Sequence, residues 1–173
     1  MSMGTDAPLV PIGAAEFKAG MALLAGAVNI VTTQGPTGPA GFTATAICSV
    51  SAEPPMLLVC LNTGSSAAPA FESAGTLCVN TVTTDLAGVA QLFGGKTPMA
   101  DRFGAARWNT ALTGAPVLQE ALVAFEARIV RVQPVATHRV LFCEVVAVHQ
   151  GDPSAGASLY WNRGFHALAP AGG

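Results

Sequence analysis

Short hydroxyl side chains share one face of a strand predicted within GFTATAICSVSAEPP, residues 41–55. Alternate side chains of an extended chain point to the same side. That face carries Thr43, Thr45, Ser49 and Ser51, with Ile47 among them. Hydroxyl groups donate and accept hydrogen bonds without carrying charge, so the face suits a neutral, hydrogen-bonding cradle for a polyhydroxylated ligand. Because the whole face cannot contact one ligand, we expect the chain to bend near Ile47.

A second polar group follows the next predicted strand. The segment NTGSS supplies Asn62, Ser65 and Ser66 at the start of a short helix predicted over residues 65–75. Free N–H groups at a helix start favour a phosphate, and Asn80 is the polar residue of the strand predicted over 76–82. The two groups could hold a phosphorylated, polyhydroxylated ligand. The alternative is that they serve only as caps and turn formers.

Other familiar motifs are incomplete in this sequence. AQLFGGKTP (90–98) ends like a phosphate-binding P-loop, but Ala90 stands where that motif needs its first glycine. We therefore interpret it as a Gly-rich turn that closes a helix. No G-x-G-x-x-G follows a predicted strand and no G-x-S-x-G occurs. The three histidines, His138, His149 and His166, have no metal-ligand spacing, so no metal site is predicted.

The amino-acid composition limits which kinds of binding partner this chain can have. Charged residues make up 10% of the chain, against roughly 25% in ordinary soluble domains, while hydrophobic residues reach 51%. Apolar surface left over after one core forms is most simply covered in a homodimer. With a net charge of −2 and no basic run, the chain has little with which to neutralise nucleic-acid phosphates. No nucleic acid is therefore expected as a partner.

Cysteine usage and hydropathy bear on location. The four cysteines form no C-x-x-C pair, so we expect reduced thiols and a cytoplasmic protein. The apolar run over residues 19–28 follows Asp6 and Glu16, unlike the core of a signal peptide. It is also too short to span a bilayer, so no membrane association is expected.

Most elements that must position these side chains are predicted strands. The pattern indicates a loose segment over residues 1–12 and one domain over 13–170. Apolar spacing predicts an amphipathic helix over 14–25, and a helix capped by Asp85 is predicted over 85–93. Residues 94–116 read as a loop. Strands are predicted over 27–33, 41–55, 56–62, 76–82, 121–133 and 138–150, with one more over 158–168. Strand and helix do not alternate regularly, so we predict an antiparallel β-barrel, closed and packed against a partner, with short helices at its edges.

The sequence resembles the short-chain flavin reductase family over residues 17–168. The specific part is the pattern G-[FM]-T-A-T-A-x-x-S-V-S-x-x-P-P, matched by residues 41–55. FKAGMALLAGAVNIVTT, LCVN, DRF with Trp108, ATHRVLFCEVVAV and LYWNRGFHAL occur in the family's order. The resemblance implies a mainly β fold, an antiparallel Greek-key split β-barrel that binds FMN and has short flanking helices. It also implies a homodimer.

Residue roles follow from the resemblance by position. Thr43, Ala44, Thr45 and Ala46 resemble the segment along the flavin ring and ribityl chain, and His138 matches a position near the nicotinamide. Ribityl and phosphate contacts are implied for Ser49, Ser51, Asn62, Ser65 and Ser66, and a covering aromatic–Arg element for Tyr160 and Arg163. Asn80 completes the candidate set. The NTGSS loop lacks the Arg or Lys of some relatives, which predicts weak affinity for the flavin phosphate.

The activity implied is hydride transfer from NADH or NADPH to FMN or FAD. The reduced flavin would then serve a partner flavin-dependent monooxygenase. Two alternatives stay open: an FMN-binding electron carrier that does not use NAD(P)H, and an oxidoreductase of the same fold with tightly bound FMN. The sequence leaves open which flavin and which nucleotide are preferred, and whether the flavin is a substrate or a prosthetic group.

Overall fold

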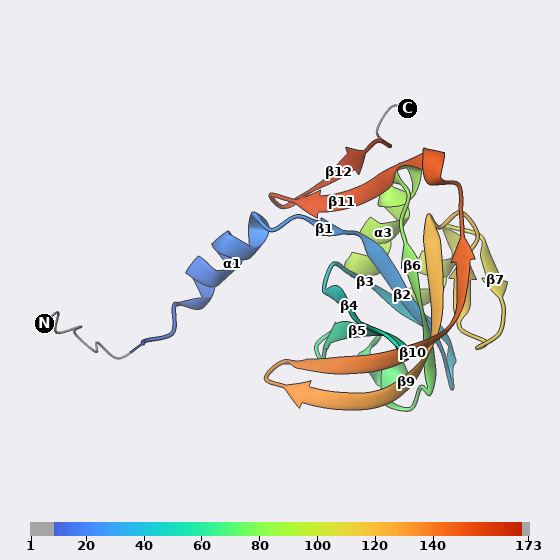
Figure 1. Ribbon diagram of the computed structural model, residues 1–173, viewed down its shortest axis with the longest axis horizontal. Coiled ribbons are helices and arrows are strands. Elements are labelled where there is room, and N and C mark those ends of the chain that lie inside the picture. Colours follow the sequence, from blue (N-terminus) through green and yellow to red (C-terminus); the bar gives the residue numbers. More distant parts are fainter. Residues whose placement is uncertain (1–8, 171–173) are drawn as a thin grey trace, which may run out of the picture.

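Seven antiparallel strands form the main sheet in the computed structural model, which describes residues 9–170 (Figure 1). Their order across the sheet is β3-β2-β6-β9-β10-β5-β4. The bounds are β2 Asn29–Gly35, β3 Gly38–Ala44, β4 Ile47–Ala52, β5 Pro55–Asn62, β6 Thr76–Thr81, β9 Val123–Val135 and β10 His138–Gln150. Every neighbouring pair is antiparallel, which confirms the predicted sheet type.

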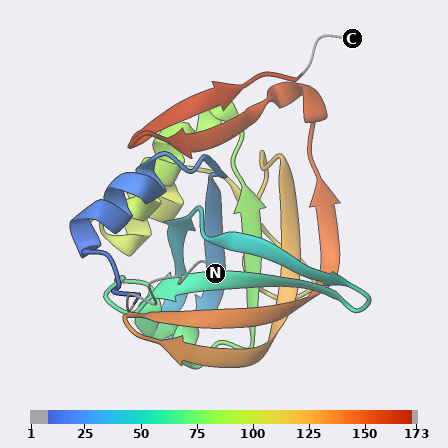
Figure 2. The ribbon, with the colours of Figure 1, turned by 60° about the vertical axis from the view of Figure 1, so that its left-hand side comes forward.

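The two edge strands of this sheet, β3 and β4, are consecutive in the chain. Only Thr45 and Ala46 separate them, and we call this pair the edge connection. The predicted single strand over 41–55 is therefore two strands, and the break falls directly before Ile47. The strands curve around a common interior (Figure 2), yet β3 and β4 do not pair with each other. The barrel is therefore split between β3 and β4. The closed barrel expected from the strand pattern is wrong, whereas the resemblance implied a split one.

The core lies inside the curved sheet. Leu57, Val59 and Leu61 of β5 and Leu141 and Cys143 of β10 point inward and are buried. Burying each large aliphatic side chain contributes about 1.5–3 kcal/mol. On the outer face of the same strands, the apolar side chains of Leu58, Cys60, Val140 and Phe142 are only half-buried. Strand β10 is therefore apolar on both faces, as its sequence predicts.

A smaller, three-stranded sheet contains the last two strands of the chain. Strand β1 (Gly26–Ala27) pairs with β11 (Ala157–Trp161), which pairs with β12 (Gly164–Leu168). The prediction of one strand over 158–168 is wrong, because the chain reverses at Asn162 and Arg163, whose φ angles are 47° and 63°. The left-handed region is open to Asn, and the sequence holds NRG at this point, so a turn signal was present.

The segment predicted as a loop, 94–116, contains regular structure. It holds α4 (Met99–Gly104) and β7 (Trp108–Thr110), and β7 pairs with β8 (Pro116–Leu118). Elements of three to six residues are too short to show a periodic pattern. The predicted cap Asp85 is also wrong: it lies in a 3-10 turn, Thr84–Leu86, and Leu86 stands at the N-cap of α3 (Ala87–Gly94). A second 3-10 turn spans Pro153–Ala155.

Helix α1 (Ala14–Ala22) extends away from the sheet (Figure 1), whereas α2 (Ala68–Glu72) packs against it. None of the α1 residues is buried, and Phe17 and Met21 are 56% and 47% exposed. The amphipathic pattern therefore lacks a partner within residues 9–170. Of the predicted N-terminal segment, residues 1–8 lie outside the described part. No helix within 9–170 has the length and apolar character needed to cross a membrane.

Candidate functional site

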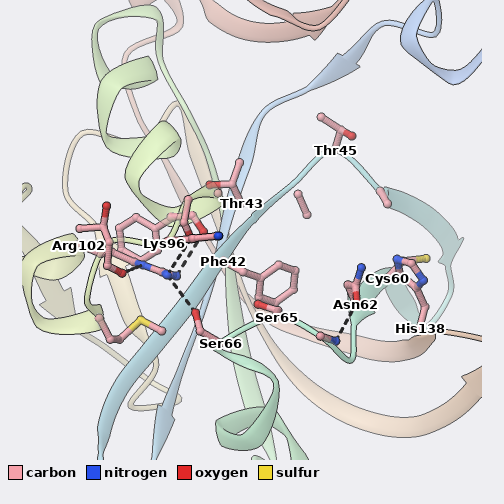
Figure 3. Close-up of a pocket in the computed structure, with 18 of the residues that line it drawn as sticks. Phe42, Thr43, Thr45, Cys60, Asn62, Ser65, Ser66, Lys96, Arg102 and His138 are labelled. Atoms are coloured by element: carbon pink, nitrogen blue, oxygen red, sulfur yellow. Dashed lines mark hydrogen bonds between the residues drawn. The ribbon is translucent and has the colours of Figure 1, made fainter. Parts of the chain in front are cut away.

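A cavity of about 810 Å³ opens beside the edge connection (Figure 3). We call it the main cavity. Its walls come from the end of β3, the edge connection, the end of β5, the loop before α2, the α3–α4 loop and the start of β10. Eight predicted site residues line it: Thr43, Ala44, Thr45, Ala46, Asn62, Ser65, Ser66 and His138. The sheet thus brings together residues that are almost 100 positions apart in sequence.

Several of these polar side chains are held by local hydrogen bonds. The Thr43 hydroxyl donates to the carbonyl oxygen of Ala90 at 2.5 Å, which ties β3 to α3. The Gly64 N–H donates to Asn62 Oδ1 at 2.8 Å, and the Ala67 N–H donates to Ser65 Oγ at 3.3 Å. Ser65 therefore stabilises the turn before α2. It is not the predicted helix cap, because α2 begins only at Ala68 and its N-cap, Ala67, has no side-chain cap. These bonds fix the directions in which the hydroxyl and amide groups face the cavity.

Arg102 is the main site residue that the sequence reasoning missed. It lies on α4, is 2% exposed, and its guanidinium reaches the cavity wall. All five N–H donors find acceptors, at distances from 2.7 to 3.4 Å. The acceptors are the carbonyl oxygens of Thr97, Gly41, Phe93 and Gly95 and the Ser66 hydroxyl. Arg102 thus joins β3, the α3–α4 loop and the Ser66 loop at one point.

The charge of Arg102 has no carboxylate partner among residues 9–170. A buried cation without a counter-ion favours an anion in the adjoining space. Lys96 adds a second positive charge on the exposed rim of the same end (Figure 3). The GGKT turn, which does not match a P-loop, nevertheless lines the main cavity. These two cations favour an anionic group at this end of the cavity, although the NTGSS loop itself carries no cation.

The opposite end of the cavity holds His138, Asn62 and Cys60 (Figure 3). His138 begins β10 directly across the sheet from Asn62. Its Nδ1 atom lies 3.0 Å from the Thr137 hydroxyl. Burial, with a smaller contribution from Cys48, raises the pKa of the Cys60 thiol. Cys60 is therefore a neutral thiol at pH 7 and not a nucleophile.

Five predicted residues lie outside the main cavity. Ser51 donates to the Glu53 carbonyl oxygen and accepts from the Glu53 N–H, so it closes the β4–β5 turn. Ser49 lies exposed on β4. Asn80 is fully buried and donates to the Ile30 carbonyl oxygen at 3.0 Å. Tyr160 and Arg163 line a different cavity, on the far side of the edge connection. The site roles of these five residues remain predictions.

The main cavity can bind a ligand but offers little acid–base chemistry of its own. No Asp or Glu of residues 9–170 lines it, and the described residues hold no cluster of three metal-ligating side chains. Small side chains at Ala44 and Ala46 leave room for a flat ring beside the edge connection. Hydroxyls, an amide and two cations suit a polyhydroxylated phosphate ester. Any redox step must therefore be carried by the bound molecules.

Comparisons with known proteins agree with this reading. The family model for the flavin reductase like domain matches residues 21–169. A protein of Stutzerimonas stutzeri (strain A1501) named FMN reductase (NADH) RutF is 52% identical over 159 residues, covering 92% of this chain and 91% of that protein. A protein of Haemophilus somnus 129PT superposes with a TM-score of 0.88 at 41% identity, over 91% of this chain and all of its own.

A third similar structure is BorF, the flavin reductase component of a bacterial two-component tryptophan halogenase. Its TM-score is 0.84 at 25% identity, covering 92% of this chain and 100% of that one. Together with the strand order, these likenesses confirm the predicted antiparallel split-barrel fold.

Proposed function

The chain belongs to the flavin reductase-like family, and on this premise we propose that it oxidises NADH and reduces FMN. The observation that carries the proposal is the 52% identity to a protein named FMN reductase (NADH), over more than nine-tenths of both chains. The main cavity supports it independently, because its walls fit a flat ring joined to a phosphorylated polyol. Residues 13–170 then form one flavin reductase-like domain, which contains the matched segment 21–169.

When bound, a flavin would supply the redox chemistry, because its N5 atom can take up a hydride from nicotinamide C4. The chain's own residues bind and orient. Thr43 and the edge connection would lie along the ring, while Asn62, Ser65 and Ser66 would hydrogen-bond the ribityl chain and phosphate. Lys96 would contact the phosphate, and Arg102 would act through its charge and its hold on Ser66. His138 would orient the nicotinamide, which fits its place at the opposite end.

The decisive assay follows NADH absorbance with FMN in excess. We expect NADH loss that depends on added FMN, and a His138→Ala variant with kcat/KM for NADH lowered on the order of 10- to 100-fold, since orientation is worth several kcal/mol of barrier. Flavin affinity should change less than twofold in this variant. His166→Ala serves as the control, because His166 is exposed and lies outside the main cavity. If NADH and NADPH are both left unconsumed with every flavin, the electron-carrier alternative would stand.

We further propose that reduced FMN leaves to serve a separate flavin-dependent monooxygenase in the cytoplasm. The relative BorF is a component of a two-component enzyme, and the four free cysteines among the described residues fit a reducing compartment. A flavin that leaves should be lost on purification. A colourless protein would support a flavin substrate, whereas a yellow protein at full occupancy would indicate the tightly bound alternative.

A homodimer is the partner that we propose for the exposed apolar surface. The outer face of β5 and β10 carries the half-buried Leu58, Val140 and Phe142, and Val50 on the neighbouring β4 is 45% exposed. Helix α1 adds Phe17. Light scattering after size exclusion should give twice the 17.4 kDa chain mass. Val50→Glu should shift the protein toward the monomer, while Leu112→Glu, at an exposed apolar residue of the β7–β8 loop outside that face, should not. A monomeric mass for the unaltered chain would contradict the dimer.

A further inference from the structure

The eight Lys and Arg residues of this chain divide into two groups. Arg107, Arg128 and Arg139 each pair with a carboxylate, and Arg131 lies over the Phe142 ring at 5.3 Å. The other four line cavities and form no ion pair among residues 9–170. They are Lys96 and Arg102 in the main cavity and Lys18 and Arg163 in a second one. No carboxylate of the described residues lines either cavity, although the net charge is −2.

The second cavity has a volume of about 770 Å³ and lies on the other side of the edge connection. Thr45 and Ala46 line both cavities. The remaining walls are one side of α1, strand β1 and the β11–β12 hairpin, with Lys18 and Arg163 on facing elements. The Asn162 N–H donates to the Ala22 carbonyl oxygen at 2.7 Å, so the hairpin turn fixes the end of α1. A ligand at the edge connection could therefore reach into either cavity.

Arg163 occupies a backbone position that glycine would fill at lower cost. Its φ of 63° lies in the left-handed region, which disfavours residues with a Cβ. Two-residue hairpin turns of this kind usually carry Asn-Gly, whereas this one carries Asn162 followed by Arg163. Residues held in such conformations cluster at ligand sites. Arg163 therefore holds an unfavourable backbone conformation at a position where its side chain lines the second cavity.

We propose that the second cavity binds the diphosphate of NADH, with Lys18 and Arg163 supplying the positive charge, while the nicotinamide lies between the edge connection and His138. This inference rests on the proposed flavin reductase function. The flavin phosphate is accounted for at the Arg102 and Ser66 end of the main cavity, away from Thr45 (Figure 3). The second phosphate of FAD would continue from that end. Lys18 and Arg163, which line the second cavity, are therefore left to bind the diphosphate of NADH.

The test compares NADH with reduced nicotinamide mononucleotide, which lacks the second phosphate and the adenosine. We expect the Lys18→Ala, Arg163→Gln double variant to lose about tenfold in kcat/KM for NADH, because both cations are exposed and each contributes modestly. The same variant should change less than twofold with the mononucleotide and in its Kd for FMN. Arg163→Lys should recover part of the loss, and raised salt should reduce the difference. Arg131→Gln is the matched control, with an exposed arginine outside both cavities.

A binding experiment keeps the inference testable without turnover. ADP-ribose should bind the unaltered protein, compete with NADH, and bind the double variant about tenfold more weakly. Equal losses with NADH and the mononucleotide, or unchanged ADP-ribose binding, would overturn the inference. A larger loss of affinity for FAD than for FMN would assign the cations to the flavin dinucleotide and also overturn it. Absence of turnover with every donor, together with intact ADP-ribose binding, would instead count against the flavin reductase function alone.

Discussion

Replacing Arg102 with alanine should lower the free energy of unfolding by on the order of 3–5 kcal/mol, because each buried group left without its partner costs roughly 1–3 kcal/mol. Five acceptors lose their donor at once, among them the Gly41 carbonyl oxygen on β3 and the Gly95 carbonyl oxygen in the α3–α4 loop. The loop that carries Lys96 would then lose its main anchor. Urea denaturation measures the change directly, through a lower midpoint.

The matched control is Arg131→Ala. That arginine is exposed and donates to Gln133 at 3.0 Å, so its removal should cost less than about 1 kcal/mol. If Arg102→Ala does not fold, Arg102→Gln removes the charge while an amide with two N–H donors keeps part of the hydrogen bonding. We expect that variant to bind FMN about 10- to 100-fold more weakly, in line with charge-assisted contacts, and riboflavin almost normally. If Arg102→Gln and the unaltered protein bound FMN with equal affinity, the role given to the buried charge would be contradicted.

Glu126→Gln is expected to cost roughly 2–4 kcal/mol of stability, since it removes a buried carboxylate whose hydrogen-bond donors then face an amide. Glu126 is fully buried on β9. Its carboxylate accepts from the N–H of Leu112 and from the N–H and hydroxyl of Thr113, and it lies 2.7 Å from His149 Nε2. This one side chain therefore holds the loop between β7 and β8 against the sheet.

The same carboxylate should make stability fall in acid. Burial works to raise the pKa of Glu126, but the hydrogen bonds from His149, Thr113 and Leu112 outweigh it and lower the pKa below 4.5. A group with a lowered folded pKa stabilises the fold above its unfolded pKa and loses that contribution as the pH falls through the folded one. Unfolding midpoints measured from pH 7 down to pH 3 should therefore drop below about pH 4.5, and less steeply in Glu126→Gln. Glu53→Gln, an exposed carboxylate in the β4–β5 turn, is the control, and parallel pH curves for the protein and Glu126→Gln would refute the assignment.

The long strands were predictable because their pattern is strong. The strand predicted over 138–150 matches β10, and 121–133 differs from β9 by two residues at each end. The break at the edge connection could be placed only near Ile47, because the alternation of polar and apolar residues in the sequence continues without interruption across Thr45 and Ala46. The β11–β12 hairpin and α4 were missed, since tertiary contacts decide elements this short.

Part of the candidate site could be predicted from the sequence. Hydroxyls gathered near one another mark a binding segment, and eight of the thirteen candidates line the main cavity. Asn80 is a polar residue of the core and not of the cavity: its amide satisfies backbone groups there, including the Leu118 N–H at 2.8 Å. Arg102 shows the opposite error, because an arginine in a short segment reads as exposed. Only the fold reveals that β3 and the α3–α4 loop surround its guanidinium.

The edge connection also determines when the binding site comes into existence during folding. Thr45 and Ala46 join the first and last strands of a seven-strand order, so they reach their final places only after β2, β6, β9, β10 and β5 have paired between them. Pairings between distant segments form slowly, because loop closure must come first. A partly assembled sheet then presents no main cavity. Flavin added to a refolding chain would bind only completed molecules, and its capture would time the last step of folding.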